Sequence, residues 1–250
     1  MGKIISLTGC KGGCGTTTLT AALGFELAAM EKKVCLLDGH AGMRALDIML
    51  RAQDKAVFDF FDLCKDICSA EQALIQIAPS LSMIAAPQLD IEDEMNLDDM
   101  RHLFQRLAKR FDYTLIDMPD PCLQICKAMR AIADENILIA TPGDISLRNM
   151  ERLCALIREN ESSPISCIIN CKDMNAKLNE RLQAQIDYLD IRLIGAIPFY
   201  EAVFMETLDR REYNAYPGKI KAAVRNTAKR LDSGEGALNL HRSRRLPWHS

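Results

Sequence analysis

Residues 8–18 read Thr-Gly-Cys-Lys-Gly-Gly-Cys-Gly-Thr-Thr-Thr. An apolar segment, Lys3 to Leu7, precedes this stretch, and an apolar pattern at helical spacing follows it from Leu19 to Leu27. We therefore predict a strand, a glycine-rich turn and a helix of about four turns. Glycines let the N–H groups of such a turn point inward, and the start of the helix adds unpaired N–H groups. This order of elements predicts a site for the phosphates of a nucleotide.

The turn departs from the usual phosphate-binding loop, G-x-x-x-x-G-K-[ST]. Gly15 is followed by Thr16 instead of lysine, so the positive charge comes from Lys11, near the start of the turn. Thr17 still offers a hydroxyl to Mg²⁺. A glycine-rich turn with an incidental, solvent-facing lysine is the alternative interpretation.

The layout Lys-Gly-Gly-x-Gly-x-Thr-Thr resembles the deviant Walker A loop of the MinD/ParA ATPases, and the loop is also similar to that of the CpaE/TadZ branch. In that family the early lysine reaches the phosphates of a dimer partner, which implies a catalytic role for Lys11. The resemblance implies that the nucleotide cofactor is ATP with Mg²⁺. The cofactor-binding residues of the loop are then Gly12, Gly13, Cys14, Gly15, Thr16, Thr17 and Thr18.

The composition is that of an ordinary globular chain, with 48% hydrophobic and 26% charged residues in 250. The net charge of −3 argues against a dedicated nucleic-acid binder. We see no signal peptide, and the longest uncharged run, Gln72 to Leu89, contains prolines and glutamines that disfavour a membrane span. We expect a cytoplasmic protein, with the inner face of the cell membrane as the alternative location.

Ten cysteines are many for such a chain. Several are spaced four apart, but none forms a C-x-x-C pair or a zinc-finger pattern. We predict that most are small buried apolar residues, and we disfavour a metal or iron–sulfur site. A separate hypothesis is an oxidation-sensitive switch at Cys10 and Cys14, whose pKa the nearby amides and Lys11 would lower.

Strand and helix patterns alternate along the rest of the chain. Apolar runs predict further strands at Val34–Asp38, Leu81–Ala85, Tyr113–Asp117, Ile137–Thr141, Ile165–Asn170 and Leu193–Pro198. Amphipathic patterns predict helices at Asn96 to Phe111, Ile145–Asn160 and Asn175–Asp190. The fold class is α/β: a single doubly wound, mostly parallel sheet with helices on both faces, as in MinD-like P-loop NTPases. One domain spans residues 1–232, and a basic, flexible tail spans 233–250.

Ligands of such sheets bind beyond the carboxyl ends of the strands. Asp38 ends one strand and opens a segment that resembles switch I of MinD, D-x-D-x-G-x-R-N-L-D, which implies a catalytic role for Asp38. His40 replaces the second aspartate of that pattern, which orients the attacking water in the family. Asp117 ends another strand and resembles the Walker B aspartate, which implies a magnesium site at Thr17 and Asp117. Pro121 stands where the family has a glycine whose amide would contact the γ-phosphate.

Two further strand ends resemble the base-binding positions of the family. Asn170 matches the asparagine that reads adenine, and its alternative role is that of an ordinary turn residue. Pro198 and Phe199 match the G-x-I-P loop that flanks the base.

The resemblance implies a nucleotide-switched homodimer that positions a septum, pilus or partition complex and binds a protein regulator or cargo. Hydrolysis is expected to be slow or absent, because Thr16, His40 and Pro121 stand where the family pattern has the loop lysine, the water-orienting aspartate and a glycine amide. Groups of these kinds stabilise the transition state. The alternative is a pseudo-ATPase scaffold that binds no nucleotide and works through protein contacts. The basic tail is either disordered or a peripheral membrane contact.

Overall fold

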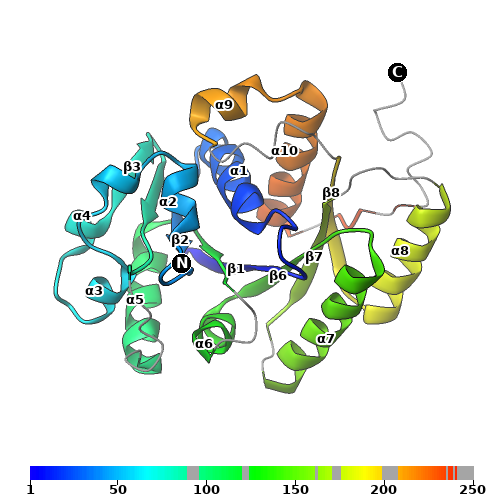
Figure 1. Ribbon diagram of the computed structural model, residues 1–250, viewed down its shortest axis with the longest axis horizontal. Helices are drawn as coiled ribbons and strands as arrows, with labels where there is room; N and C mark the ends of the chain where they lie inside the picture. The colour runs from blue at the N-terminus through cyan, green and yellow to red at the C-terminus, as the bar shows by residue number, and fades with distance from the viewer. Residues whose placement is uncertain are drawn as a thin grey trace.

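The computed structural model describes residues 1–88, 96–119, 124–160, 163–170, 176–198, 208–234, 236–238 and 240. The described residues form one eight-stranded sheet in the order β3-β4-β2-β5-β1-β6-β7-β8 (Figure 1). The strands are β1 Lys3–Gly9, β2 Val34–Asp38, β3 Ile75–Ala78, β4 Leu81–Ile84, β5 Tyr113–Asp117, β6 Glu135–Ala140, β7 Ile165–Asn170 and β8 Arg192–Ile197. All neighbouring strands are parallel except β3, which runs antiparallel to β4 at one edge. The predicted mostly parallel sheet is confirmed.

Helices cover both faces of this sheet (Figure 1). They are α1 Thr16–Ala29, α2 Ala45–Met49, α3 Phe60–Cys64, α4 Ala70–Ala73, α5 Leu97–Arg110, α6 Gln124–Ile132, α7 Asp144–Asn160, α8 Ala176–Leu189, α9 Arg210–Ala215 and α10 Gly218–Ser233, with a 3-10 turn at Gln53–Lys55. Alternate residues of one strand enter different cores: Leu36 packs with α1 and α10, whereas Cys35 and Leu37 pack with α3, α5 and α6. This alternation makes the inner strands apolar on both faces, as their sequences predict.

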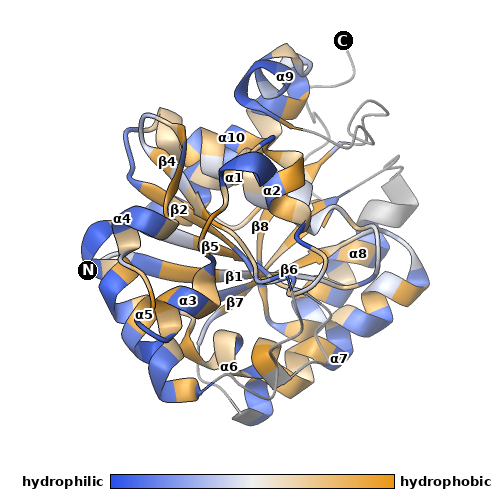
Figure 2. Cartoon of the chain, turned by 60° about the vertical axis from the view of Figure 1, so that its left-hand side comes forward, coloured by the Kyte–Doolittle hydropathy of each residue, from blue (hydrophilic) through white to orange (hydrophobic). Residues whose placement is uncertain are grey.

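The predicted helix from Asn96 to Phe111 is confirmed, and the residues at its two ends explain its bounds. The side chain of Asn96 accepts a hydrogen bond from the backbone N–H of Asp98 at 2.9 Å, and α5 then runs to Arg110. Acidic residues occupy its first turn and basic residues its last, which complements the helix dipole. Figure 2 shows hydrophilic residues on the outward face of this helix and hydrophobic residues along the strands.

The uncharged run from Gln72 contains two short strands, β3 and β4, which the sequence analysis predicted only in part. Strand β3 was not predicted, because it has four residues and one of them, Gln76, is polar. Strand β4 matches the predicted Leu81–Ala85 apart from its last residue. Within the described residues, no helix has both the length and the apolarity that crossing a membrane requires.

The cysteines behave as predicted wherever the structure describes them. Eight are buried, and Cys122 and Cys171 lie outside the described residues. Three of them, Cys35, Cys126 and Cys167, have no solvent exposure and belong to two hydrophobic clusters on the face of the sheet opposite α1 and α10. They therefore contribute to packing as small apolar side chains.

Two described residues beyond α10 contact the rest of the fold, one at strand β8 and one at helix α8. The backbone N–H of Leu238 donates to the carbonyl of Leu193 at 2.8 Å, and that of Leu240 donates to the side chain of Gln183 at 2.8 Å. Leu240 is 2% exposed. These contacts lie on the tail side of the predicted boundary at residue 232. Residues 241–250 lie outside the described residues, so a flexible tail stays a prediction there.

Candidate functional site

The glycine-rich loop connects the end of β1 to the start of α1 at the carboxyl edge of the sheet. Gly13 and Gly15 have left-handed φ angles of 69° and 90°, which favour glycine. Gly15 precedes the first helical residue, Thr16, and no side chain caps this helix end. The first turn of α1 also contains no acidic residue. Its free N–H groups and positive dipole end therefore face the loop without a built-in anion.

A side chain from a distant strand supports the loop from behind. The Asn170 side-chain amide, at the end of β7, donates to the carbonyl of Cys14 at 2.9 Å. A Cβ atom on Gly15 would lie only 2.7 Å from Asn170 Nδ2, so the close approach also requires glycine. The structure thus places Asn170 against the glycine-rich loop, while adenine reading by this residue stays a prediction.

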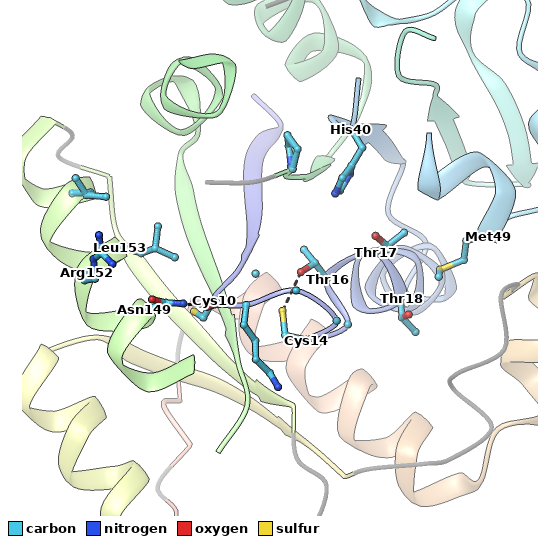
Figure 3. Close-up of a pocket in the computed structure, with 17 residues that line it drawn as sticks. Cys10, Cys14, Thr16, Thr17, Thr18, His40, Met49, Asn149, Arg152 and Leu153 are labelled. Carbon is cyan, nitrogen blue, oxygen red and sulfur yellow. Dashed lines mark hydrogen bonds between the residues drawn. The ribbon is translucent and has the colours of Figure 1, made fainter. Parts of the chain in front are cut away.

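A cavity of about 700 Å³ opens above the loop (Figure 3). Every predicted loop residue from Lys11 to Thr18 lines it, and Lys11 itself is exposed. His40 and Pro119 contribute from the ends of β2 and β5. The volume and the polar backbone suit a ligand of nucleotide size.

Helix α7 supplies a wall of this cavity that the sequence analysis missed. Asn149 and Arg152 line it, and the side-chain amide of Asn149 donates to the carbonyl of Cys10 at 2.9 Å (Figure 3). The signal that could have found them is the strand order. Because β6 pairs with β1, the helix that follows β6 must begin beside the loop that follows β1.

The residues that were predicted to flank the base do not line the cavity in the part of the chain that the structure describes. Among the described residues, Pro198 is half-buried just after β8 and does not line the cavity. Phe199 lies outside the described residues, as does Pro121. The roles of Pro198 and Phe199 therefore stay predictions.

Asp38 and Asp117 face each other across neighbouring parallel strands, β2 and β5. Both are fully buried. Asp38 is well satisfied: Oδ1 accepts the backbone N–H of His40, and Oδ2 accepts that of Leu46, both at 2.9 Å. His40 Nδ1 lies 3.2 Å from Asp38 Oδ1 and 3.5 Å from Asp117 Oδ2. The histidine that replaces an aspartate thus lies between two carboxylates.

Asp117 is the least satisfied of these groups. Within the described part of the chain, neither of its buried carboxylate oxygens has a hydrogen bond of good geometry. Burial raises the pKa of Asp117 to about 7, and Asp38 adds to this, while His40 and the hydroxyls of Thr17 and Thr20 oppose it. Two buried oxygens without partners fit a divalent cation, which is the group that the predicted magnesium residues Thr17 and Asp117 would hold.

His40 responds to the same environment. Burial lowers its pKa, but the contact with Asp38 and the charges of Asp117 and Asp38 outweigh burial, so the pKa is raised overall. The imidazole therefore carries positive charge more readily than a free histidine and partly neutralises the two carboxylates.

The proposed thiol switch finds no support at Cys10. Its side chain is 2% exposed. Burial raises the pKa of the Cys10 thiol far above its usual range, where the switch hypothesis required a lowered one. Cys14 is equally buried, with its Sγ atom 3.4 Å from Thr16 Oγ1.

Three comparisons place this geometry among known proteins. Residues 2–153 match the family described as "Cellulose biosynthesis protein BcsQ". The septum site-determining protein MinD of Synechocystis sp. is 32% identical over 242 residues, which cover 93% of this chain and 90% of that protein. A chain of the MinC:MinD cell division protein complex of Aquifex aeolicus superposes with a TM-score of 0.77 at 25% identity, covering 94% of this chain and 97% of that one. MinD of Pyrococcus horikoshii, complexed with Mg-ADP, shares the fold with a TM-score of 0.76 at 23% identity, covering 94% and 98%.

Proposed function

Because the chain belongs to the MinD/ParA family of P-loop proteins, we propose that it binds ATP and acts as a nucleotide-dependent dimer in spatial positioning. The observation that carries the proposal is the loop: an uncapped helix start, two left-handed glycines and an exposed Lys11 around one cavity. Backbone amides bind phosphate oxygens whatever the neighbouring side chains are. The replacement of the loop lysine by Thr16 therefore leaves the binding surface in place.

Thr17 and Asp117 are the residues that would hold Mg²⁺ with the nucleotide. The unpartnered oxygens of Asp117 support this assignment, because a divalent cation would relieve a buried carboxylate. When bound, the cation would offset the negative charge of the phosphates.

Slow or absent hydrolysis is the second part of the proposal. In the family pattern the residue at position 40 is an aspartate that orients the attacking water. Here His40 Nδ1 is directed at Asp38 and Asp117 instead. Groups that orient or stabilise the transition state are each worth about 3 kcal/mol, and Thr16 and Pro121 are further departures.

Dimerisation, a protein regulator or cargo, and a contact of the basic tail, residues 233–250, with the membrane surface belong to the same proposal. They are supported by the family and by the solved MinC:MinD complex of a relative. We assign catalytic roles to Lys11 and Asp38. Lys11 suits such a role because it is exposed at the rim of the cavity.

A scaffold that binds no nucleotide is the second candidate, and one observation favours it. His40, with its raised pKa, already supplies positive charge to Asp38 and Asp117, where a cation would bind. Such a protein would keep the fold and lose the need for a nucleotide.

Calorimetric titration of Mg·ATP into the full chain separates the two candidates. We expect micromolar binding by the wild type, at least about tenfold weaker binding by Lys11→Ala, and unchanged binding by Lys109→Ala, a lysine at the opposite edge of the sheet. A ligand that binds the native state at 100 times its Kd adds about 2.7 kcal/mol of stability, so the Tm must rise as well. Absence of both heat and a Tm shift would establish the scaffold. Phosphate release at the rate of an active MinD would contradict slow hydrolysis.

A further inference from the structure

Three side chains at the ends of β2 and β5 converge on one point. Asp38, His40 and Asp117 each offer one ligand atom, and these atoms all lie within 4.8 Å of one another. The two distances from His40 Nδ1, 3.2 Å to Asp38 and 3.5 Å to Asp117, are those between atoms that share a metal ion. Nitrogen and oxygen ligands bind such ions at about 2.0–2.2 Å, so atoms on one ion lie roughly 3–4 Å apart.

Asp117 provides an independent reason to expect a ligand at this point. Its side chain is fully buried, and within the described residues neither carboxylate oxygen has a hydrogen bond of good geometry, although the hydroxyls of Thr17 and Thr20 are close enough to lower its pKa. Oδ2 is directed toward His40 at 3.5 Å. A buried carboxylate without donors is costly unless a cation or a proton neutralises it.

The other two ligands are held in place by their surroundings. Backbone N–H groups of His40 and Leu46 fix the carboxylate of Asp38 from two sides. His40 reaches the cavity wall, and its side chain is 20% exposed, so an ion has a path from solvent. Pre-oriented ligands and an open side are the requirements of a functional metal site.

The donor set is unlike one for Mg²⁺. Magnesium selects oxygen ligands and retains its waters, whereas imidazole nitrogen suits the first-row transition ions. One imidazole and two carboxylates therefore form a mixed nitrogen and oxygen site. Its affinity should be higher for Co²⁺ than for Mn²⁺ and lowest for Mg²⁺.

We propose that Asp38, His40 and Asp117 form a binding site for a divalent first-row transition ion, occupied before any nucleotide binds. The proposal deepens the proposed function, on which it rests only for the role of the ion: it names the cation class of the same cavity. His40 then supplies a nitrogen ligand where the family pattern has a carboxylate, which favours this ion over free Mg²⁺ in the nucleotide-free protein, whereas Thr17 and Asp117 would hold the Mg²⁺ that enters with a nucleotide.

The test is a titration of the full chain with Co²⁺ in the absence of nucleotide, followed by visible absorption. We expect saturable absorption of one bound Co²⁺, loss of the signal when Zn²⁺ is added at comparable concentration, and no loss with a roughly hundredfold excess of Mg²⁺. His40→Ala should weaken Co²⁺ binding by at least about tenfold. His102→Ala, an exposed histidine on α5, is the matched control and should bind as the wild type does.

His40→Asp keeps a ligand at the position and guards against a folding defect in His40→Ala. We expect this variant to lose the preference for transition ions over Mg²⁺. Mg²⁺ and Zn²⁺ should then displace Co²⁺ at similar concentrations. Equal Co²⁺ binding by wild type and His40→Ala, no binding by the wild type, or equal competition by Mg²⁺ in the wild type would each overturn the inference. Mg·ATP binding without Co²⁺ binding contradicts the metal site alone. Co²⁺ binding without Mg·ATP binding contradicts the nucleotide proposal alone.

Discussion

The two sides of the candidate site are made of different chemical groups. The loop side, from Gly9 to Thr18, presents backbone amides shaped by left-handed glycines. The side at the ends of β2 and β5 presents three side chains, Asp38, His40 and Asp117. A backbone surface keeps its chemistry when a side chain such as Thr16 changes. A side-chain surface changes its chemistry with a single substitution.

In the proposed function, this difference assigns phosphate binding to the loop, and cation choice and water orientation to the side chains at the strand ends. In the proposed function the loop side alone would hold the phosphates, because its donors are N–H groups that every residue except proline carries. In the same proposal, the strand-end side would decide which cation is held and whether the attacking water is oriented. Variants that act on one side and spare the other therefore test the distinction.

The largest effect is expected from Gly15→Val, which damages the loop side. A β-branched residue at φ 90° is strained, and its Cβ would meet Asn170 Nδ2 at 2.7 Å. We expect a loss of about 3 kcal/mol in the free energy of unfolding, measured with urea, and no Tm increase with Mg·ATP.

Gly12→Ala is the matched control for that variant. Gly12 has no left-handed φ, and an added Cβ would meet no atom within 4 Å. We expect a change within about 0.5 kcal/mol. Equal losses in the two variants would show that the loop is not shaped as described.

Asp117→Asn acts on the strand-end side and should stabilise the protein in cation-free buffer. The folded-state pKa of Asp117 is raised from 3.8 to about 7. Between these pH values the native state binds more protons than the unfolded state, so the free energy of unfolding falls as pH rises. At pH 8 the wild type carries the full cost, and we expect Asp117→Asn to be more stable by roughly 2 kcal/mol.

Urea unfolding of both proteins from pH 5 to pH 8 measures this difference. The difference in the free energy of unfolding between Asp117→Asn and the wild type should increase with pH. It should disappear when a bound divalent cation stabilises the wild type. Asp54→Asn, at an exposed position, should show neither behaviour. A gap independent of pH would mean that Asp117 titrates as an ordinary aspartate.

The smallest effects are expected from the two amides that hold the loop from outside. Asn170→Ala and Asn149→Ala each remove one hydrogen bond of 2.9 Å to a loop carbonyl. Each should lower the free energy of unfolding by about 1 kcal/mol and weaken Mg·ATP binding by about fivefold in calorimetry. Asn214→Ala, exposed on α9, is the control. Unchanged affinity in both variants would show that the glycines alone shape the loop.

Most of the sheet could be predicted because its inner strands are apolar on both faces. The runs at Val34–Asp38 and Tyr113–Asp117 match β2 and β5 residue for residue. Strand β3 and the short helices between residues 45 and 73 could not be predicted, because they are too brief for a periodic pattern to stand out. Their formation depends on tertiary contacts: β3 pairs with β4, α2 packs on α1 and β2, and α3 packs on α5.

The site divides in the same way. The loop from Lys11 to Thr18 was predicted whole, since glycine spacing and the start of a helix are local properties of consecutive residues. Asn149 and Arg152 were missed, because nothing near them in the chain indicates a phosphate loop more than 130 residues away.

Local order in the chain was thus sufficient for the strand–loop–helix unit, since dihedral preferences and apolar periodicity act over a few residues. The position of His40 between Asp38 and Asp117 required the folded sheet. Strands β2 and β5 are neighbours although more than 70 residues separate them, and β1 then lies between β5 and β6. Only this non-sequential pairing brings two buried carboxylates opposite each other. Their charges raise the pKa of His40 against the effect of burial, whereas burial and the charge of Asp38 raise the pKa of Asp117.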